Sequence, residues 1–344
     1  MYQFSIVIPC FNSSPYITET LESIVNQHLG NKIQVVLVDD CSTESFDEIV
    51  NTFNDRLNIK MIKTDNNCGP GMARQVGVDN ADGEWITFCD HDDIFVANTF
   101  NKIRTIIRNN PSRNIIQAQF QEVRQDGTVI PYFFDKGSNW IHAKFFRKKF
   151  LDENKLTFKE GLATHEDVYF SILTRFMTEH LNAPILECSI VIYNWYNRPE
   201  SLSHRRETGI DLFENHFEDY VTSCFGPIEK LKDILTPNEI LVRGLSSLLF
   251  IYFYSQGFLR LGRKHHERDA KLLNEVAGKL CEYLNLTPRQ IVQIAYDNPD
   301  VFCGIREKAY QSVGYFLERE DLYDLIKNCI PQEEVMVDLS ESNS

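Results

Sequence analysis

Two patterns of apolar and polar residues alternate along the first 120 residues of the chain. Short, nearly continuous apolar runs are typical of strands buried inside a sheet. Between these runs, apolar residues recur at helical spacing, for example at Ile17, Leu21 and Ile24. The runs predicted to be strands are residues 4–8, 35–38, 59–62, 85–89 and 115–120. Strands that alternate with helices in this way predict an α/β fold with a mostly parallel sheet and flanking helices.

The pattern changes near residue 209, after which only helical periodicity remains. Within this region Thr287 and Pro288 are typical of a helix cap followed by the first helical residue. A chain of 344 residues is long enough for two domains. We therefore predict an α/β domain over residues 1–206, an all-helical domain over 207–337 that contacts the acceptor or a partner, and a disordered acidic tail over 338–344.

The turns that follow the strands exclude two common nucleotide-binding motifs. The first strand leads into residues 9–12 (Pro-Cys-Phe-Asn), so the G-x-G-x-x-G loop of dinucleotide-binding domains is absent there. The chain also lacks the P-loop pattern G-x-x-x-x-G-K-[ST]. The side chains that follow the strands are instead acidic, as at Asp39 and Asp40. Ligands of open α/β sheets bind beyond the carboxyl ends of the strands, and an acidic edge suits ribose hydroxyls, base edges and a metal ion.

Three carboxylates follow the strand at residues 85–89, namely Asp90, Asp92 and Asp93. Carboxylates this close repel one another unless a cation joins them. Oxygen ligands favour a hard divalent ion, Mn2+ or Mg2+, which commonly binds phosphate at the same time. The alternative is a polar loop in which Asp92 or Asp93 caps the next helix.

Composition narrows the class of protein further. The net charge of −14 argues against general adhesion to nucleic acid or to anionic membranes. Nine cysteines without a C-x-x-C pair are typical of reduced thiols, so we expect a cytoplasmic protein. The longest apolar run, residues 245–254, is too short and too interrupted to span a bilayer. We expect neither a transmembrane segment nor a secretory signal.

Four segments, taken together and in order, resemble the successive blocks of family 2 glycosyltransferases, which are inverting enzymes of the GT-A fold. These segments are residues 5–12 (SIVIPCFN), 38–42 (VDDCS), 71–75 (GMARQ) and 88–93 (FCDHDD). The resemblance covers roughly residues 4–205. Cys41 stands where the family usually has Gly, and Gln75 stands where Asn is common. Neither departure removes a reacting group.

The resemblance implies a binding site for the nucleoside part of a nucleoside diphosphate sugar. Asp40 would bind the base or the ribose, with Asp39 as a lesser contributor. Pro9 and Phe11 would shape the base pocket. Asp90 would lie near the ribose.

The same resemblance implies how the diphosphate is bound. Asp92 would ligate the Mn2+ or Mg2+ ion that bridges the diphosphate, and His204 would be a further metal ligand unless it is a surface histidine. Arg198 would offer bidentate contacts to phosphate oxygens. Arg74 would lie beside the nucleotide, the alternative being a cation on the helix surface paired with a nearby aspartate.

Two further segments would complete the site. Residues 139–147 resemble the family's acceptor-side segment, in which Trp140 would stack on a sugar ring unless it is a core residue. Glu166 and Asp167 begin a predicted helix, where carboxylates gain from the helix dipole. Neighbouring residues on a helix face different directions. One of these two carboxylates can therefore face the predicted donor site while neighbouring groups bind the other. The resemblance assigns Asp167 as the general base with Glu166 beside it; the alternative is a pair that only caps the helix.

These features predict a metal-dependent inverting glycosyltransferase that moves a sugar from a nucleoside diphosphate sugar to an acceptor hydroxyl. The acceptor is a glycan, a lipid carrier, a protein or a modified nucleic-acid base. The cationic cluster at residues 260–268 would contact a polyanionic acceptor, unless it is a solvated helix end. One alternative function is a sugar-nucleotide pyrophosphorylase, in which a glycine-rich basic loop is expected after the first strand. The other is a sugar-nucleotide-binding scaffold without chemistry.

Overall fold

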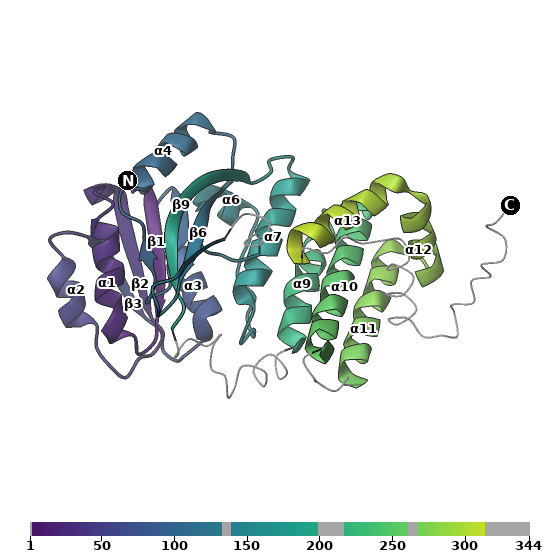
Figure 1. The fold of residues 1–344 in the computed structure, drawn as a ribbon, viewed down its shortest axis with the longest axis horizontal. Coiled ribbons are helices and arrows are strands. Elements are labelled where there is room, and N and C mark those ends of the chain that lie inside the picture. The colour runs from purple at the N-terminus through teal and green to yellow at the C-terminus, as the bar shows by residue number, and fades with distance from the viewer. Residues whose placement is uncertain (1, 133–138, 199–216, 261–266, 314–344) are drawn as a thin grey trace. The chain divides into compact units, whose positions relative to one another are not determined.

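The computed structural model describes residues 2–132, 139–198, 217–260 and 267–313 (Figure 1). The chain divides into two compact units, an N-terminal unit (Met1–His216) and a helical unit (Phe217–Ser344). The predicted boundary between residues 206 and 207 lies outside the described residues, as does the predicted tail over 338–344. Both stay predictions.

The N-terminal unit is built around one sheet whose first half is parallel. In this half β1 lies between β2 and β4, and β2 pairs with β3 on its other side. The strands are β1 (Phe4–Cys10), β2 (Ile33–Asp39), β3 (Asn58–Lys63) and β4 (Trp85–Phe88). The connecting helices are α1 (Ser14–Val25), α2 (Asp47–Phe53) and α3 (Gly69–Asp79). The predicted α/β fold class is confirmed, and β1, β2 and β4 are buried throughout, which explains their continuous apolar runs.

The second half of the sheet continues from β4 in the order β8, β6, β9, β5, with β7 paired to β6. In this half β6 and β9 run parallel, and the other pairings are antiparallel. The strands are β5 (Ile94–Phe95), β6 (Ile115–Val123), β7 (Val129–Tyr132), β8 (Lys144–Arg147) and β9 (Leu186–Tyr196).

One prediction about this half was wrong. The family resemblance also implies that residues 193–204 form a loop over the donor diphosphate, whereas Tyr193 to Tyr196 are the end of β9 and Asn197 and Arg198 follow it without regular secondary structure. β9 carries a short apolar run, residues 190–193, but most of the strand is only partly buried, unlike β1, β2 and β4. The rest of the predicted loop, from residue 199 to 204, lies outside the described residues.

Aromatic packing joins the two halves of the sheet. Phe4 of β1, Phe145 of β8 and Phe100 make edge-to-face contacts with ring centroids 5.2–5.5 Å apart. The remaining helices of this unit are α4 (Phe100–Asn109), α6 (Lys148–Glu153) and α7 (Glu166–His180). Helix α3 packs on β1 and β2 and also contacts α7, so it connects the parallel half of the sheet to the start of α7.

The helical unit is organised around α10, which contacts α9, α11 and α13. Its helices are α9 (Phe217–Leu231), α10 (Pro237–Arg260), α11 (Glu267–Leu284), α12 (Pro288–Asp297) and α13 (Pro299–Val313). The predicted cap of α12 is confirmed, because Thr287 and Gln290 form a reciprocal capping box. None of the helices described here is long and apolar enough to cross a membrane. Of the predicted cationic cluster, residues 261–266 lie outside the described part of the chain.

Candidate active site

Asp40 follows the last residue of β2 and its carboxylate caps helix α3. Its Oδ1 accepts hydrogen bonds from the Cys68 backbone N–H at 2.9 Å and from the Thr64 hydroxyl at 3.0 Å. Its Oδ2 accepts from the Gly69 backbone N–H at 2.9 Å. A carboxylate at a helix N-terminus meets unpaired N–H groups and the positive end of the helix dipole. Asp40 is therefore held rigidly where β2 and α3 meet.

Asp39 is also buried and its carboxylate is ionised. It accepts from the Ser42 backbone N–H at 2.8 Å and pairs with the Lys63 ammonium at 3.1 Å. Burial alone would raise the pKa of Asp39, but the hydrogen bonds from Ser42 and Lys63 lower it below its usual value. Beside this corner, Pro9 is buried in β1, whereas Phe11 is 48% exposed just beyond it. The structure thus presents an exposed aromatic ring next to the acidic end of β2.

Arg74 lies inside the protein and bridges two carboxylates. It is 5% exposed. Its Nη2 donates to Asp90 Oδ1 at 2.6 Å, and its Nη1 donates to Glu166 Oε1 at 2.7 Å. Although burial on its own raises the pKa of Asp90, the Arg74 charge lowers it below the ordinary value. The alternative of a cation on the helix surface is wrong, because the Arg74 side chain faces the inside of the unit.

Asp92 lies beside Arg198. The Arg198 Nε is 3.6 Å from Asp92 Oδ2, and Nη2 donates to the Asp92 backbone oxygen at 3.0 Å. The guanidinium also lies over the Tyr16 ring, 4.1 Å from its centroid, and near the Tyr196 ring. Burial and the neighbouring Asp90 charge raise the pKa of Asp92. The structure therefore brings together the carboxylate predicted to bind the metal and the cation predicted to bind the diphosphate.

Asp93 fixes the loop between β4 and β5, a role that the sequence did not predict. It is 1% exposed and accepts from the Tyr193 hydroxyl at 2.7 Å and from the Tyr196 backbone N–H at 2.8 Å. The Tyr193 oxygen in turn accepts from the Asp90 backbone N–H at 3.1 Å. Burial and the charges of Asp90 and Asp92 raise the pKa of Asp93 well above its usual range. Asp93 and Tyr193 together hold the acidic loop against β9.

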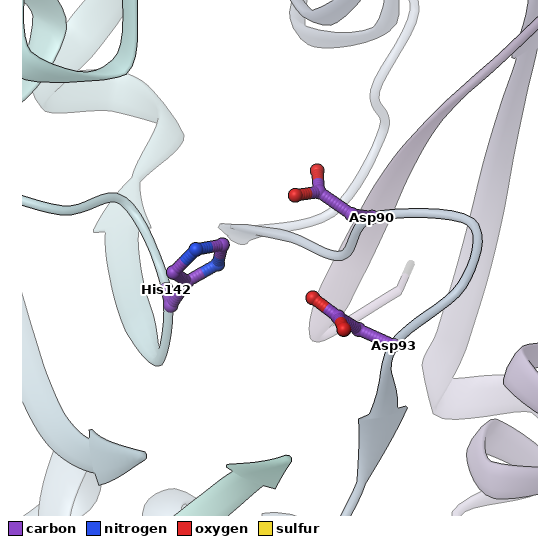
Figure 2. A group of neighbouring side chains, drawn as sticks. All are labelled: Asp90, Asp93 and His142. Atoms are coloured by element: carbon purple, nitrogen blue, oxygen red, sulfur yellow. The ribbon is translucent and has the colours of Figure 1, made fainter. Parts of the chain in front are cut away.

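Asp90, Asp93 and His142 form a group that could hold a metal ion, since one ligand atom from each lies within 4.8 Å of the others. Figure 2 shows the two aspartates on one loop and the imidazole on a neighbouring segment. Burial lowers the pKa of His142 to about 4, so the ring is neutral at pH 7, as a metal ligand must be. Carboxylate oxygens with one imidazole suit Mn2+. Asp92 is not part of this group.

The predicted ligand His204 lies outside the described residues. The sequence did not indicate His142 as a ligand, because its neighbours Ile141 and Ala143 are apolar and a histidine between them is usually a buried core residue. Its ring does stack on Tyr193, with centroids 5.1 Å apart. The same ring therefore packs in the core and offers a nitrogen to the acidic loop.

Helix α7 begins at Glu166, as predicted, and its first two carboxylates have different surroundings. Glu166 is buried and bound to Arg74. Asp167 is partly exposed, and burial together with the Glu166 charge raises the pKa of Asp167 to about 7. The left-handed backbone of His165, with φ of 60°, turns the chain into the helix. The pair thus supplies one anchored carboxylate and one titratable carboxylate.

Trp140 is partly buried in a group of aromatic rings. It stacks on Phe120 with centroids 5.3 Å apart and meets Trp195 edge to face at 5.3 Å. Tyr132 also stacks on Phe120, with ring centroids 4.9 Å apart. The ring of Trp140 is thus fixed in orientation and keeps some exposed surface. Its contact with an acceptor stays a prediction.

Replacing Gly71 with Ala is expected to destabilise the N-terminal unit by about 1–3 kcal/mol. A Cβ at position 71 would lie 2.8 Å from both Cβ and Cγ of Glu166, so α3 and α7 would have to separate. The measurement is the free energy of unfolding from urea titration. Gly278→Ala is the matched control, because a Cβ there has no heavy atom within 4 Å and alanine favours the helix. Equal effects of the two substitutions would contradict the close α3–α7 contact.

An open sheet with acidic loops beyond β2 and β4, facing a carboxylate pair at the start of α7, is the architecture of a GT-A domain. Residues 5–175 match the model of Glycosyl transferase family 2. The N-terminal unit of this chain belongs to that family, as the resemblance of its four segments indicated.

Individual relatives resemble parts of the chain. The poly(ribitol-phosphate) β-N-acetylglucosaminyltransferase TarS of Staphylococcus aureus strain Mu50 is 31% identical over 201 residues, which are 53% of this chain and 33% of TarS. The minor teichoic acid biosynthesis protein GgaA of Bacillus subtilis strain 168 is 30% identical over 188 residues, or 48% of this chain and 42% of GgaA. The chain thus spans less than half the length of these relatives.

Solved structures show the same fold. The crystal structure of S. aureus TarS 1–349 in complex with UDP has a TM-score of 0.65 and 21% sequence identity. The match covers 95% of this chain and 90% of that one. TarS 1–349 in complex with UDP-GlcNAc gives a TM-score of 0.60 over the same shares.

Proposed function

We propose that the chain is a metal-dependent inverting glycosyltransferase that uses a nucleoside diphosphate sugar as donor. The observation that carries the proposal is the pair at the start of α7, where Glu166 is bound to Arg74 and Asp167 is left to titrate near neutral pH. A general base works best when its pKa lies near the operating pH. Arg74 also contacts Asp90, so one side chain connects the helix turn that carries the proposed base to the proposed donor loop.

In the proposed reaction, Asp167 removes the proton from an acceptor hydroxyl as its oxygen attacks the anomeric carbon of the donor sugar. The new carbon–oxygen bond forms while the bond to the diphosphate breaks, and the diphosphate leaves with the electron pair. Attack from the side opposite the leaving group inverts the anomeric centre. Arg198, which lies beside Asp92, would contact the departing phosphate oxygens.

Mn2+ or Mg2+, when bound, would act as a Lewis acid for the leaving diphosphate. The proposed ligand is Asp92, with Asp90 beside it on the same loop. The carboxylates of both are partly exposed, at 21% and 29%, whereas Asp93 is buried. A diphosphate can reach partly exposed oxygens, so we favour Asp92 over Asp93 as the residue that contacts the ion.

The names of the relatives support one class of donor and one class of acceptor for the proposed reaction. UDP and UDP-GlcNAc are bound by TarS 1–349, so we propose a UDP-sugar as donor, with Asp40 and Asp39 on the base and ribose side. TarS and a glucosyltransferase of Bacillus spizizenii act on poly(ribitol-phosphate), according to their names. The proposed acceptor is therefore a hydroxyl of a phosphate-bearing polyol chain, which is a polyanion.

A donor screen tests this proposal. The full chain is mixed with UDP-GlcNAc, UDP-glucose, UDP-galactose, GDP-mannose or CMP-sialic acid, each with Mn2+, and thermal unfolding is followed. A ligand of the folded state raises stability by RT ln(1 + [L]/Kd), so a true donor shifts the midpoint. Donors that shift it are then tested for transfer to poly(ribitol-phosphate), with donor hydrolysis as a second readout. Binding without either reaction would favour the scaffold without chemistry.

The rate of transfer is expected to rise with pH through about 7 and to level off above about 8. Below its pKa of about 7, Asp167 is protonated and accepts no proton, so kcat/KM should fall about tenfold for each pH unit. The measurement is kcat/KM between pH 5.5 and 9 at saturating metal. A profile that is flat across this interval would show that no group with this pKa acts as the base.

A further inference from the structure

We infer that Arg74 is a positioning residue, which holds the base helix α7 and the donor loop after β4 in one fixed arrangement. This inference rests on the proposed function and adds to it a role for a side chain that does not itself react. The sequence indicated a contact between Arg74 and the nucleotide. The structure shows both of its Nη groups bound to protein carboxylates.

The geometry is that of a buried two-armed bridge. One arm of the guanidinium reaches Asp90, in the loop after β4, and the other reaches Glu166, in the first turn of α7. The two carboxylates are far apart in the sequence, and Arg74 on α3 is the residue that contacts both. A planar guanidinium offers donors in a fixed fork, whereas a lysine ammonium is a compact charge on a flexible stem. The arrangement therefore depends on arginine in particular.

Two neighbours of Arg74 on α3 contact the same region. Gly71, one turn earlier, leaves room for the Glu166 side chain, which a Cβ would meet at 2.8 Å. Gln75 accepts a hydrogen bond from the Phe158 backbone N–H at 2.9 Å, just before α7. Positions separated by three or four residues share a helix face. Gly71, Arg74 and Gln75 thus form one face of α3 against which the segment leading to the base is seated.

Charge gives the bridge a second effect. Asp90, Glu166 and Asp167 would repel one another in a site without a counter-ion. Arg74 lies among them, and its charge opposes the effects of burial and of Glu166 that raise the pKa of Asp167. Lys144 on β8 is a second buried basic residue whose charge interacts with Asp167, although burial lowers the pKa of Lys144 to about 7. Loss of the Arg74 bridge would therefore displace Asp167, the proposed base, and would leave the carboxylates of Asp90 and Glu166 without their shared counter-ion.

The test uses Arg74→Lys, Glu166→Gln and the double variant, in the full chain. Arg56→Lys is the matched control, because Arg56 also makes a two-armed contact, but with the two carboxylate oxygens of Glu22 on α1. Arg74→Lys is expected to lower kcat by ~10²-fold, the effect of a misplacement of about 1 Å, with the donor KM changed less than about threefold. Arg56→Lys should leave both constants within about threefold of the wild type, because its ion pair with Glu22 is exposed. The double variant should be no slower than the slower single variant, because both changes break one bridge.

Hydrogen exchange supplies a readout that needs no activity. The amides of the first turn of α7 should exchange faster in Arg74→Lys than in the wild type and in Arg56→Lys. Unchanged amide exchange in the first turn of α7 would overturn the inference. A kcat of the double variant that is reduced by the product of the two single-variant factors would also overturn it. A collapse of donor affinity with kcat retained would also overturn it and make Arg74 a donor-binding residue. A wild-type chain that neither binds a donor nor transfers its sugar would reject the proposed function. The exchange data would still show whether Arg74 holds the start of α7 in place.

Discussion

Asp167→Asn is expected to reduce kcat by ~10²-fold or more while leaving donor affinity nearly unchanged, because a carboxamide cannot take up the acceptor proton. Asp167 is the partly exposed member of the pair at the start of α7, and its pKa of about 7 leaves it deprotonated just above neutrality. Asn keeps the size and shape of the side chain. Steady-state kinetics give kcat, and calorimetric titration with UDP gives the affinity for the nucleotide.

Asp152→Asn is the matched control for this substitution. Asp152 is an exposed residue of α6 that pairs with Lys148 at 2.9 Å, so its loss removes the same charge away from the site. The control should keep kcat within about twofold, as expected of an exposed ion pair. If Asp167→Asn abolished donor binding while bound donor was still turned over, Asp167 would be a binding residue and the base would have to be sought elsewhere.

The same variant is expected to be more stable than the wild type above pH 7. The pKa of Asp167 is about 7 in the folded protein and 3.8 as the ordinary value, so the folded state holds this proton more tightly than the unfolded state does. The wild type therefore loses stability as pH rises from about 4 to about 7, and Asn does not. A gain in the unfolding midpoint at pH 8 that shrinks toward pH 4 would show that Asp167 is held in a site that costs stability.

The parallel half of the fold could be predicted from the sequence because its strands are buried on both faces. β1, β2 and β4 read as continuous apolar runs, and the carboxyl ends of parallel strands meet at one edge. In the second half of the sheet, β6 was predicted from the apolar run at residues 115–120, but β8 and β9 were not. In β9 exposed, half-buried and buried residues are mixed, and its pairing with the nine-residue β6 depends on contacts between distant segments.

The candidate site was predictable as a set of residue types but not as a set of contacts. Four segments in order along the chain, residues 5–12, 38–42, 71–75 and 88–93, indicated the family. No local pattern could show that Arg74 would be shared between Asp90 and Glu166, since those partners come together only through the fold. The same holds for the hydrogen bond between Asp93 and Tyr193. Charge pairs across such distances are set by tertiary packing, which single-sequence patterns do not record.

Asp92→Asn is expected to abolish metal-supported transfer and to weaken Mn2+ binding, while the fold is retained. An amide oxygen carries no charge, so it is a far weaker ligand for a hard divalent cation than a carboxylate. The contact with Arg198 would weaken as well, but it joins two partly exposed side chains and contributes little to stability. Transfer across a manganese titration, Mn2+ binding by electron paramagnetic resonance, and circular dichroism for the fold are the three measurements.

His142→Phe separates the two possible metal arrangements in the same experiment. Phenylalanine keeps a ring that can stack on Tyr193 but removes the nitrogen that lies near Asp90 and Asp93. With the ion on Asp92, His142→Phe should bind Mn2+ within about threefold of the wild type, whereas Asp92→Asn should lose at least tenfold, the usual scale for loss of a ligand contact. With the ion among Asp90, Asp93 and His142, His142→Phe should instead lose at least tenfold in Mn2+ affinity, and Asp92→Asn should stay within about threefold of the wild type. Activity of Asp92→Asn within a few-fold of the wild type, at every manganese concentration, would remove Asp92 from the metal site.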